Sequence, residues 1–290
     1  MTQESKCTTQ EPMNSGPPDF TIVTPSYNYR EYVRDMLDSV AAQKGASYEH
    51  LVYDAGSTDG TLDVISEYGH VHLTVEPDEG MSDAINKGFK AAKGRWVMWL
   101  NTDDRLKPGA LAAVKKFADG RHNADVIYGA WDFIGAAGDY QRTMGLFPFR
   151  KLMLAHYGCY IGSTATFFKR VTTINEGYLL NERFQCVMDG EYYNRLAGAG
   201  KKFVYMPTVL ADFRMHGENI SQKLLGAEGL DSVLSLQLIL AESRTIRRVY
   251  GVSFFKSDHL NSVVDALLFY GFKAMKFLMK LPYRPSRLQE

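Results

Sequence analysis

The alternation of short apolar runs with amphipathic stretches between residues 20 and 104 constrains the fold of this 290-residue chain most strongly. Four runs are rich in apolar, β-branched and aromatic side chains, which predicts buried strands at 20–24, 51–53, 72–75 and 96–100. The stretches between them repeat apolar residues at helical spacing. Strands that alternate with helices form βαβ units, so we expect an α/β fold with a mostly parallel, Rossmann-like sheet flanked by helices.

Polar clusters follow three of the predicted strands directly. They lie at 25–28, 54–60 and 103–104, and two of them contain residues suited to tight turns. In an open parallel sheet, ligands bind at the carboxyl ends of the strands. The three clusters therefore predict one ligand site at a single edge of the sheet.

The composition excludes several other classes of protein. The formal net charge is zero, so no overall field attracts nucleic acid, and we expect no nucleic-acid partner. Cys7, Cys159 and Cys186 lie far apart, which argues against a structural zinc site and favours a cytoplasmic protein with reduced thiols. No apolar run approaches the roughly 20 residues that a membrane-spanning helix needs. Residues 1–18 are polar and proline-containing, and we expect a disordered tail there.

The carboxylate pair Asp103 and Asp104 follows the predicted strand 96–100. Adjacent carboxylates repel each other unless a cation or hydrogen-bond donors compensate for their charge. A Mn²⁺ or Mg²⁺ ion that bridges a diphosphate would do so, because hard cations bind carboxylate and phosphate oxygens. The alternative is that Asp104 caps the following helix. The convergence of three polar clusters favours the metal site.

Two further carboxylates could contact a nucleotide. Asp54 ends a predicted strand and could accept the imide N–H of a pyrimidine or the N–H edge of guanine; the alternative is an ordinary Asx turn. Asp83 lies in the first turn of a predicted helix, where a carboxylate is favoured with or without a ligand.

Four motifs, at residues 24–28, 54–61, 76–88 and 100–104, resemble those of family 2 glycosyltransferases in content and order. The resemblance covers about residues 20–221 and implies the GT-A fold, a nucleoside-diphosphate sugar, a divalent metal and inversion at the anomeric carbon. Ala55 stands where this branch usually has glycine, and Thr102 where it usually has serine.

The same resemblance assigns roles to the residues of these motifs. Pro25, Tyr27 and Asp54 are expected around the base, and Asp103 and Asp104 on the ribose, the diphosphate and the metal. The combination of Asp54 with an aromatic residue favours a pyrimidine, so we expect a UDP-sugar.

An inverting transferase also needs a carboxylate base for the acceptor hydroxyl. Residues 188–193 resemble the family segment that opens a helix in the acceptor region, which makes Asp189 the expected base and Glu191 the alternative. Asp189 could instead be a plain N-cap. Residues 214–221 resemble the segment whose histidine reaches the metal, so His216 is expected as a further ligand, against the alternative of a structural histidine.

The pattern predicts a GT-A catalytic domain at 19–221, with a nucleotide-sugar half at 19–130 and an acceptor half at 131–221, followed by a helical extension at 222–290. Residues 260–281 have a helical apolar stripe with lysines near its end, which is typical of interfacial membrane helices. Packing on the catalytic domain or on a second subunit, as in a homodimer, is the alternative. Membrane contact would suit a lipid-linked saccharide acceptor at the inner face of the membrane.

We therefore expect a metal-dependent enzyme that transfers a single sugar in surface polysaccharide synthesis. One competing class is a nucleotidyltransferase that makes nucleotide sugars, but residues 25–28 contain no glycine to hold a triphosphate. The other is a non-catalytic scaffold that binds sugar nucleotides. The presence of all three carboxylates, Asp103, Asp104 and Asp189, argues against a scaffold.

Overall fold

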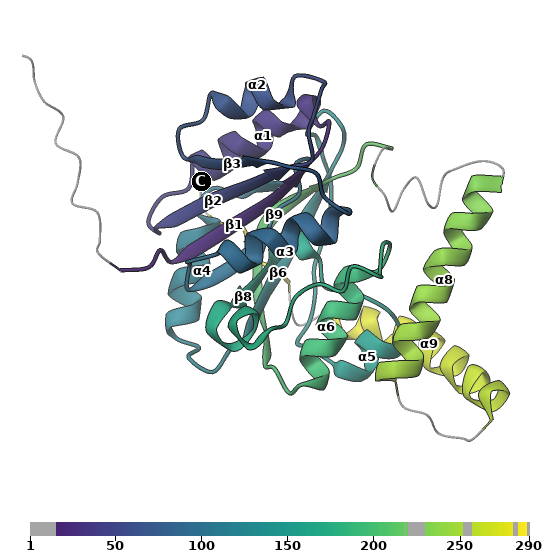
Figure 1. Ribbon diagram of the computed structural model, residues 1–290. Helices are drawn as coiled ribbons and strands as arrows, with labels where there is room; N and C mark the ends of the chain where they lie inside the picture. The colour runs from purple at the N-terminus through teal and green to yellow at the C-terminus, as the bar shows by residue number, and fades with distance from the viewer. Residues whose placement is uncertain (1–15, 218, 220–229, 252–256, 281–283, 289–290) are drawn as a thin grey trace, which may run out of the picture.

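The computed structural model describes residues 16–217, 219, 230–251, 257–280 and 284–288. Within these residues the chain is an α/β protein built on a nine-stranded sheet, flanked by helices (Figure 1). The strand order is β3-β2-β1-β4-β8-β6-β9-β5, and β7 pairs with β6. The predicted tail falls outside the described residues except for its last three positions.

The first half of the sheet has the predicted parallel arrangement. Strand β1 pairs in parallel with both β2 and β4, and β2 pairs in parallel with β3. The elements are β1 (Phe20–Ser26), α1 (Arg30–Ala41), β2 (Tyr48–Asp54), α2 (Thr61–Ser66), β3 (Val71–Val75), α3 (Met81–Ala91) and β4 (Trp96–Trp99).

The helices of this half cover both faces of the sheet. The chain first extends the sheet from β1 through β2 to β3 and then returns to add β4 on the other side of β1. Because crossovers between parallel strands are right-handed, this reversal puts α3 on the face opposite α1 and α2. Helix α3 lies so close to β1 that a Cβ at Gly88 would come within 2.2 Å of a methyl group of Val23.

The second half of the sheet is mixed. Strand β8 is antiparallel to β4 and β6, whereas β9 is parallel to β6 and antiparallel to β5. The region at 131–168 contains the end of β6, β7, α5 and the start of β8. The elements are β5 (Arg105–Leu106), α4 (Ala110–Asp119), β6 (Val126–Ile134), β7 (Tyr140–Met144), α5 (Lys151–His156), β8 (Thr166–Lys169), α6 (Met188–Gly198) and β9 (Phe203–Arg214), with 3-10 turns at 163–165, 170–172 and 174–176.

An aromatic cluster joins the two halves. The rings of Trp99 on β4 and Phe168 on β8 stack with centroids 5.5 Å apart, and Tyr193 of α6 packs on both. All three side chains are buried. Buried aromatic rings contribute much of a core's hydrophobic stabilisation, so this cluster fixes α6 against the sheet.

Two helices follow the sheet, as expected: α8 (Leu230–Tyr250) and α9 (Asp258–Lys280). They lie on the side of the molecule formed by α5 and α6 (Figure 1). Residues 284–288 return to the sheet, where Ser286 exchanges backbone hydrogen bonds with Pro207 and Val209 of β9. Within the described part of the chain, no helix combines the length and the apolar character needed to cross a membrane.

Candidate active site

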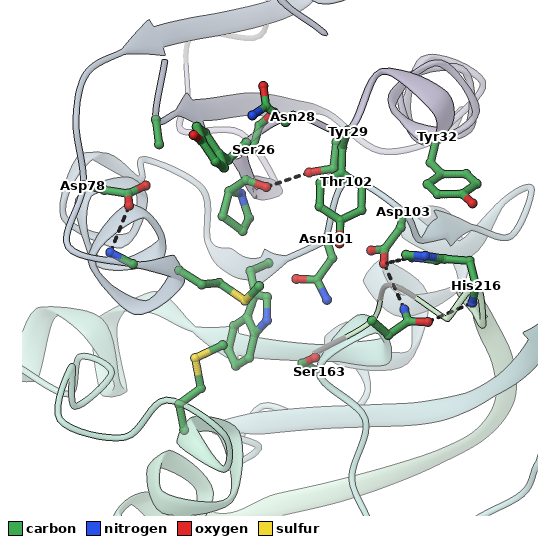
Figure 2. Close-up of a pocket in the computed structure, with 18 of the residues that line it drawn as sticks. Ser26, Asn28, Tyr29, Tyr32, Asp78, Asn101, Thr102, Asp103, Ser163 and His216 are labelled. Atoms are coloured by element: carbon green, nitrogen blue, oxygen red, sulfur yellow. Dashed lines mark hydrogen bonds and ion pairs between the residues drawn. The ribbon is translucent and has the colours of Figure 1, made fainter. Parts of the chain in front are cut away.

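A cavity of about 1350 Å³ opens at the carboxyl ends of β1 and β4, where the direction of sheet growth reverses. This is the position at which open α/β sheets bind their ligands. All three predicted polar clusters contribute to its lining (Figure 2). The loop that leads into α6 supplies another part. The predicted site residues that line it are Pro25, Tyr27, Asp103, Asp189 and His216.

Pro25 and Tyr27 lie where β1 ends. The carbonyl of Pro25 accepts a 2.7 Å hydrogen bond from the hydroxyl of Thr102, which ties the first strand end to the segment after β4 (Figure 2). Tyr27 is 57% exposed although it lines the cavity, so its ring is available to a ligand. An exposed aromatic ring beside a cavity is suited to stacking on a base.

Asp54 is buried, and its own loop uses both carboxylate oxygens. Oδ1 accepts the backbone N–H groups of Gly56 and Ser57, and Oδ2 accepts the hydroxyl of Ser57 at 2.7 Å. The Asx turn that was the alternative is therefore present. Ala55, rather than Asp54, lines the cavity in the described structure. A contact between Asp54 and a base stays a prediction.

Asp83 is directed to its own helix. It forms an ion pair with Lys87 one turn later and accepts the backbone N–H of Glu79. The cavity lining in this loop comes from Asp78 and Gly80 instead. Asp83 thus stabilises the N-terminal end of α3. Its contact with a nucleotide stays a prediction.

Asp103 and His216 form a direct pair at the cavity. Asp103 Oδ2 lies 2.8 Å from His216 Nε2 and accepts a 3.1 Å hydrogen bond from the side-chain amide of Asn219 (Figure 2). The imidazole is fully buried between the rings of Tyr29 and Tyr32. Its Nδ1 has no hydrogen-bond partner within the described residues. The pairing brings together two predicted ligands from opposite halves of the sequence.

The neighbouring carboxylate, Asp104, is turned away from the cavity. It is buried, with one oxygen accepting the hydroxyl of Thr164 at 2.6 Å and the other accepting the backbone N–H of Arg214 at 3.0 Å. Burial, together with the charge of Asp103, raises the pKa of Asp104 well above its usual range. Asp104 does not line the cavity, and its predicted direct contact with the metal stays a prediction. Its contacts instead connect the end of β4 to η1 (Ser163–Ala165) and β9.

The cavity holds a pair of adjacent donors that suit a hard divalent cation. A carboxylate and an imidazole, Asp103 and His216, line it, and the described residues contain no cluster of three or more His, Cys, Asp or Glu that could hold a metal on its own. Mg²⁺ and similar ions are commonly held by one or two carboxylates together with substrate phosphates and water. The donor set therefore fits an ion that arrives with a diphosphate.

Asp189 lies in the first turn of α6 and faces the same cavity. The side chain is half-buried; Oδ1 accepts the N–H of Gly190, and Oδ2 lies 3.8 Å from the thiol of Cys159. Burial raises the pKa of Asp189 above its ordinary value. A carboxylate with a raised pKa and access to a cavity is a suitable general base.

Glu191, the alternative base, points elsewhere. It is buried, forms an ion pair with Arg195 and accepts the hydroxyl of Tyr250 on α8 at 2.8 Å. Two residues along a helix correspond to about 200° of rotation, so Asp189 and Glu191 face opposite sides of α6. The structure therefore leaves Asp189 as the carboxylate of this segment that faces the cavity.

Sequence reasoning missed one residue that shapes this site, Glu242 of α8. Its buried carboxylate accepts three backbone N–H groups, from Gln185, Cys186 and Val187, at 2.9–3.1 Å. These are the last residues before α6, and two of them line the cavity beside Asp189. A buried carboxylate that accepts several backbone donors at a helix N-terminus is strongly held. Only a long-range contact identifies it, because Glu242 lies within an unremarkable helical pattern.

Comparison with known proteins gives the family. The model for glycosyl transferase family 2 matches residues 21–174, which is more than half of the chain. The chain belongs to glycosyl transferase family 2. This glycosyltransferase is 28% identical over 207 residues to a PGL/p-HBAD biosynthesis glycosyltransferase of Mycobacterium bovis, covering 69% of this chain and 78% of that protein. It is 34% identical over 110 residues to the putative teichuronic acid biosynthesis glycosyltransferase TuaG of Bacillus subtilis, covering 36% and 44%.

Solved structures show the same fold for this glycosyltransferase. S. aureus TarS 1-349 in complex with UDP-GlcNAc aligns with a TM-score of 0.58 at 17% identity, over 80% of this chain and 73% of that chain. The mannosyltransferase PcManGT from Pyrobaculum calidifontis, in complex with GDP-Man and Mn²⁺, aligns with a TM-score of 0.53 at 16% identity, over 95% and 86%. The predicted GT-A-type fold is thereby confirmed, and a nucleotidyltransferase is not supported.

Proposed function

We propose that this glycosyltransferase transfers one sugar from a UDP-sugar to a hydroxyl of a lipid-linked saccharide, with inversion at the anomeric carbon. One observation carries the proposal: a single cavity is lined by the Asp103–His216 pair and by Asp189, a carboxylate with a raised pKa. The pair suits a diphosphate with its cation, and the separate carboxylate suits an acceptor hydroxyl.

The donor is proposed to bind along the ends of β1 and β4. Tyr27 and Pro25 would contact the base, and Asp103 would lie toward the ribose and diphosphate. The UDP-GlcNAc complex of the structurally similar TarS supports a UDP-sugar, whereas PcManGT was solved with GDP-Man. The sequence expectation of a pyrimidine, based on Asp54 and Tyr27, favours the first of these.

A divalent metal, Mn²⁺ or Mg²⁺, would be held by Asp103 and His216. When bound, such an ion would neutralise the charge that develops on the departing diphosphate. The chain's own contribution is to orient these donors. Asn219 bonds both to the carboxylate of Asp103 and to the backbone N–H of His216, and Tyr29 and Tyr32 restrict the imidazole ring.

Asp189 is proposed to act as the general base. Its carboxylate would remove the proton of the acceptor hydroxyl while the hydroxyl oxygen forms a bond to the anomeric carbon. The bond from that carbon to the β-phosphate oxygen would break, and UDP would leave with the electron pair. A single displacement inverts the configuration of the sugar. The proton ends on Asp189, whose raised pKa favours its uptake.

The acceptor is proposed to be a growing surface saccharide carried on a lipid at the inner face of the membrane. The names of the relatives support this class, since one acts in PGL/p-HBAD biosynthesis and another is assigned to teichuronic acid biosynthesis. The acceptor would enter past the loop before α6, where Gln185, Cys186 and Met188 line the cavity.

The proposal is tested by binding and turnover with the intact protein. Thermal unfolding is measured with UDP-sugars and GDP-sugars, each with Mn²⁺ and with chelator; we expect the largest stabilisation from a UDP-sugar with Mn²⁺. Release of UDP in the presence of a lipid extract then distinguishes an enzyme from a scaffold. Binding of the sugar nucleotide without any metal effect, or without turnover on extracts that contain acceptor, would contradict the proposal.

A further inference from the structure

Helix α9 has two apolar faces, and the body of the protein covers only one of them. On the inner face, Phe269 stacks on Tyr157 with centroids 5.3 Å apart, and Asp265 bonds to the ring of His156 at 2.8 Å. Phe272 and Met279 pack against the main core further along the same face. These contacts anchor the helix along most of its length, so the opposite face is held outward.

The outer face of α9 carries no charge over five turns. On a helical wheel its residues span about 140°, and those described there are half-exposed or exposed. Leu267, Tyr270 and Leu278 are 68%, 67% and 64% exposed, which is exceptional for side chains of this size. The face, which we call the α9 outer face, comprises Leu260, Val263, Val264, Leu267, Tyr270, Gly271, Ala274, Met275 and Leu278. Contiguous exposed apolar surface of this kind marks an interaction site.

The C-terminal part of the chain that carries the α9 outer face is basic. Lys273 is exposed on α9 beside this face, and Arg248 is exposed near the end of α8. The carboxylate of Asp265 faces inward to His156. Over residues 244–290 the sequence has nine Lys or Arg against three Asp or Glu. The partner of this surface should therefore be apolar and negatively charged.

This charge decides between a bilayer and a second copy of the chain. A two-fold dimer would bring the same patch together from both protomers, and would thus join two surfaces of like, positive charge. An anionic lipid surface instead offers an apolar interior for the leucines and negative head groups for the cations. Tyr270 has the amphipathic ring that is enriched at membrane interfaces.

We propose that the α9 outer face docks flat on an anionic lipid bilayer. Since no described helix can span a membrane, the helix would lie in the plane of the interface. The inference deepens the proposed function and rests on it for its purpose, because α5 contacts α6, α8 and α9 and so joins this helix to the acceptor side of the cavity. Helix α8 holds residues 185–187 through Glu242, and those residues lead to Asp189. Docking would bring a lipid-linked acceptor to that side.

The test is flotation of the intact protein with vesicles. We expect it to float with vesicles that contain phosphatidylglycerol, weakly with pure phosphatidylcholine, and less at high salt, since screening weakens the attraction of the cations. Leu267→Glu should lower the bound fraction about tenfold or more, because a buried leucine is lost and a like charge is added. Lys273→Gln should lower affinity about fivefold, the contribution of one cation at an anionic surface.

Matched controls change the same kinds of residue elsewhere. Val171→Glu alters a valine that is 52% exposed in the 3-10 turn at 170–172, and Lys44→Gln removes an exposed lysine before β2; neither should change flotation. Thermal unfolding confirms that each variant is folded. Equal flotation with phosphatidylglycerol and phosphatidylcholine vesicles would overturn the proposal. So would equal flotation of the wild type and Leu267→Glu. So would a protein that does not float and forms a dimer that Leu267→Glu dissociates. Donor binding, measured separately, reports on the proposed function alone.

Discussion

The donor side and the acceptor side of the cavity are built by different means. On the donor side, the site residues follow the ends of β1 and β4 directly, and adjacent parallel strands bring those ends together. On the acceptor side, Asp189 opens a helix whose position depends on contacts with α8, far along the chain. The first arrangement is local and repeats along the sequence, whereas the second is assembled by tertiary packing. Substitutions on the two sides should therefore fail in different ways.

The largest effect is expected at the donor side, from Asp103→Asn. This change keeps the shape of the side chain but removes the charge that faces the cavity and His216. Transfer should fall by several orders of magnitude, because stabilisation of a departing diphosphate is worth several kcal/mol. Steady-state kinetics with Mn²⁺ and isothermal titration with UDP are the measurements.

The neighbouring carboxylate is the control for that prediction. Asp104→Asn keeps an acceptor oxygen for the hydroxyl of Thr164 but can lose the bond from the N–H of Arg214, and the residue does not line the cavity. We expect activity to fall about tenfold at most, as for loss of one neutral hydrogen bond. If Asp104→Asn were as inactive as Asp103→Asn, the result would support direct metal binding by Asp104.

The next effect is expected at the acceptor side, from Asp189→Asn. General-base catalysis contributes about 10² to 10⁴ in rate, so transfer should fall by that order while UDP binding stays unchanged. Glu191→Gln should instead lower the thermal stability, because it weakens the pair with Arg195 and the contact with Tyr250. A sugar product of retained configuration, or a fully active Asp189→Asn enzyme, would refute the assignment.

The pH dependence of transfer sharpens the same point. Asp189 must be deprotonated to act as a base, and burial raises its pKa above the ordinary value. The rate should therefore decline about tenfold per pH unit below that raised pKa, at a higher pH than an exposed aspartate would give. The same shift affects stability, because the folded state binds this proton more tightly than the unfolded state. Asp189 therefore lowers the free energy of unfolding at pH values above its folded-state pKa. This destabilisation disappears at pH values below its unfolded-state pKa. The measurement is kcat/KM as a function of pH for the wild type and for Asp189→Glu. The decline at acidic pH reports the pKa of the base.

A smaller effect is expected from the contact that links α8 to the acceptor side. Glu242→Gln keeps one acceptor oxygen but replaces the other by an amide donor, which would face either the N–H of Gln185 or those of Cys186 and Val187. We expect a loss of about 1–3 kcal/mol in the free energy of unfolding and faster hydrogen exchange at residues 185–187. The KM for acceptor should rise several-fold without a change in UDP affinity. An equal loss of UDP affinity would show that the two sides are not separate.

The smallest effect concerns the base of the nucleotide. We expect UDP to bind a few-fold to about tenfold more tightly than GDP, because a base-edge hydrogen bond distinguishes the two. Competition titrations with Mn²⁺ present measure the ratio. Tighter GDP binding would overturn the pyrimidine prediction, and an unchanged ratio in Asp54→Asn would mean that Asp54 serves only its own loop.

Sequence reasoning predicted the first half of the fold closely. The runs that became β1, β2, β3 and β4 were identifiable because buried parallel strands need continuous apolar residues, and the helices between them need a regular apolar stripe. The second half was less predictable. The short strand β8 inserts between β4 and β6 in antiparallel orientation, and no local pattern specifies which strand it will join. That choice depends on burial of groups such as Phe168 against Trp99.

The amino-acid sequence by itself determined the strand ends at which polar residues gather, and hence Pro25, Tyr27 and Asp103 as cavity residues. Only the tertiary structure decided which of two adjacent carboxylates faces the cavity. Successive residues point in different directions, and here Thr164 and Arg214, which are distant in sequence, bind Asp104. The same holds for Glu242. A carboxylate on a helix has no assigned partner until packing brings three unpaired backbone N–H groups to it, and the high cost of leaving such groups buried without an acceptor then fixes the contact.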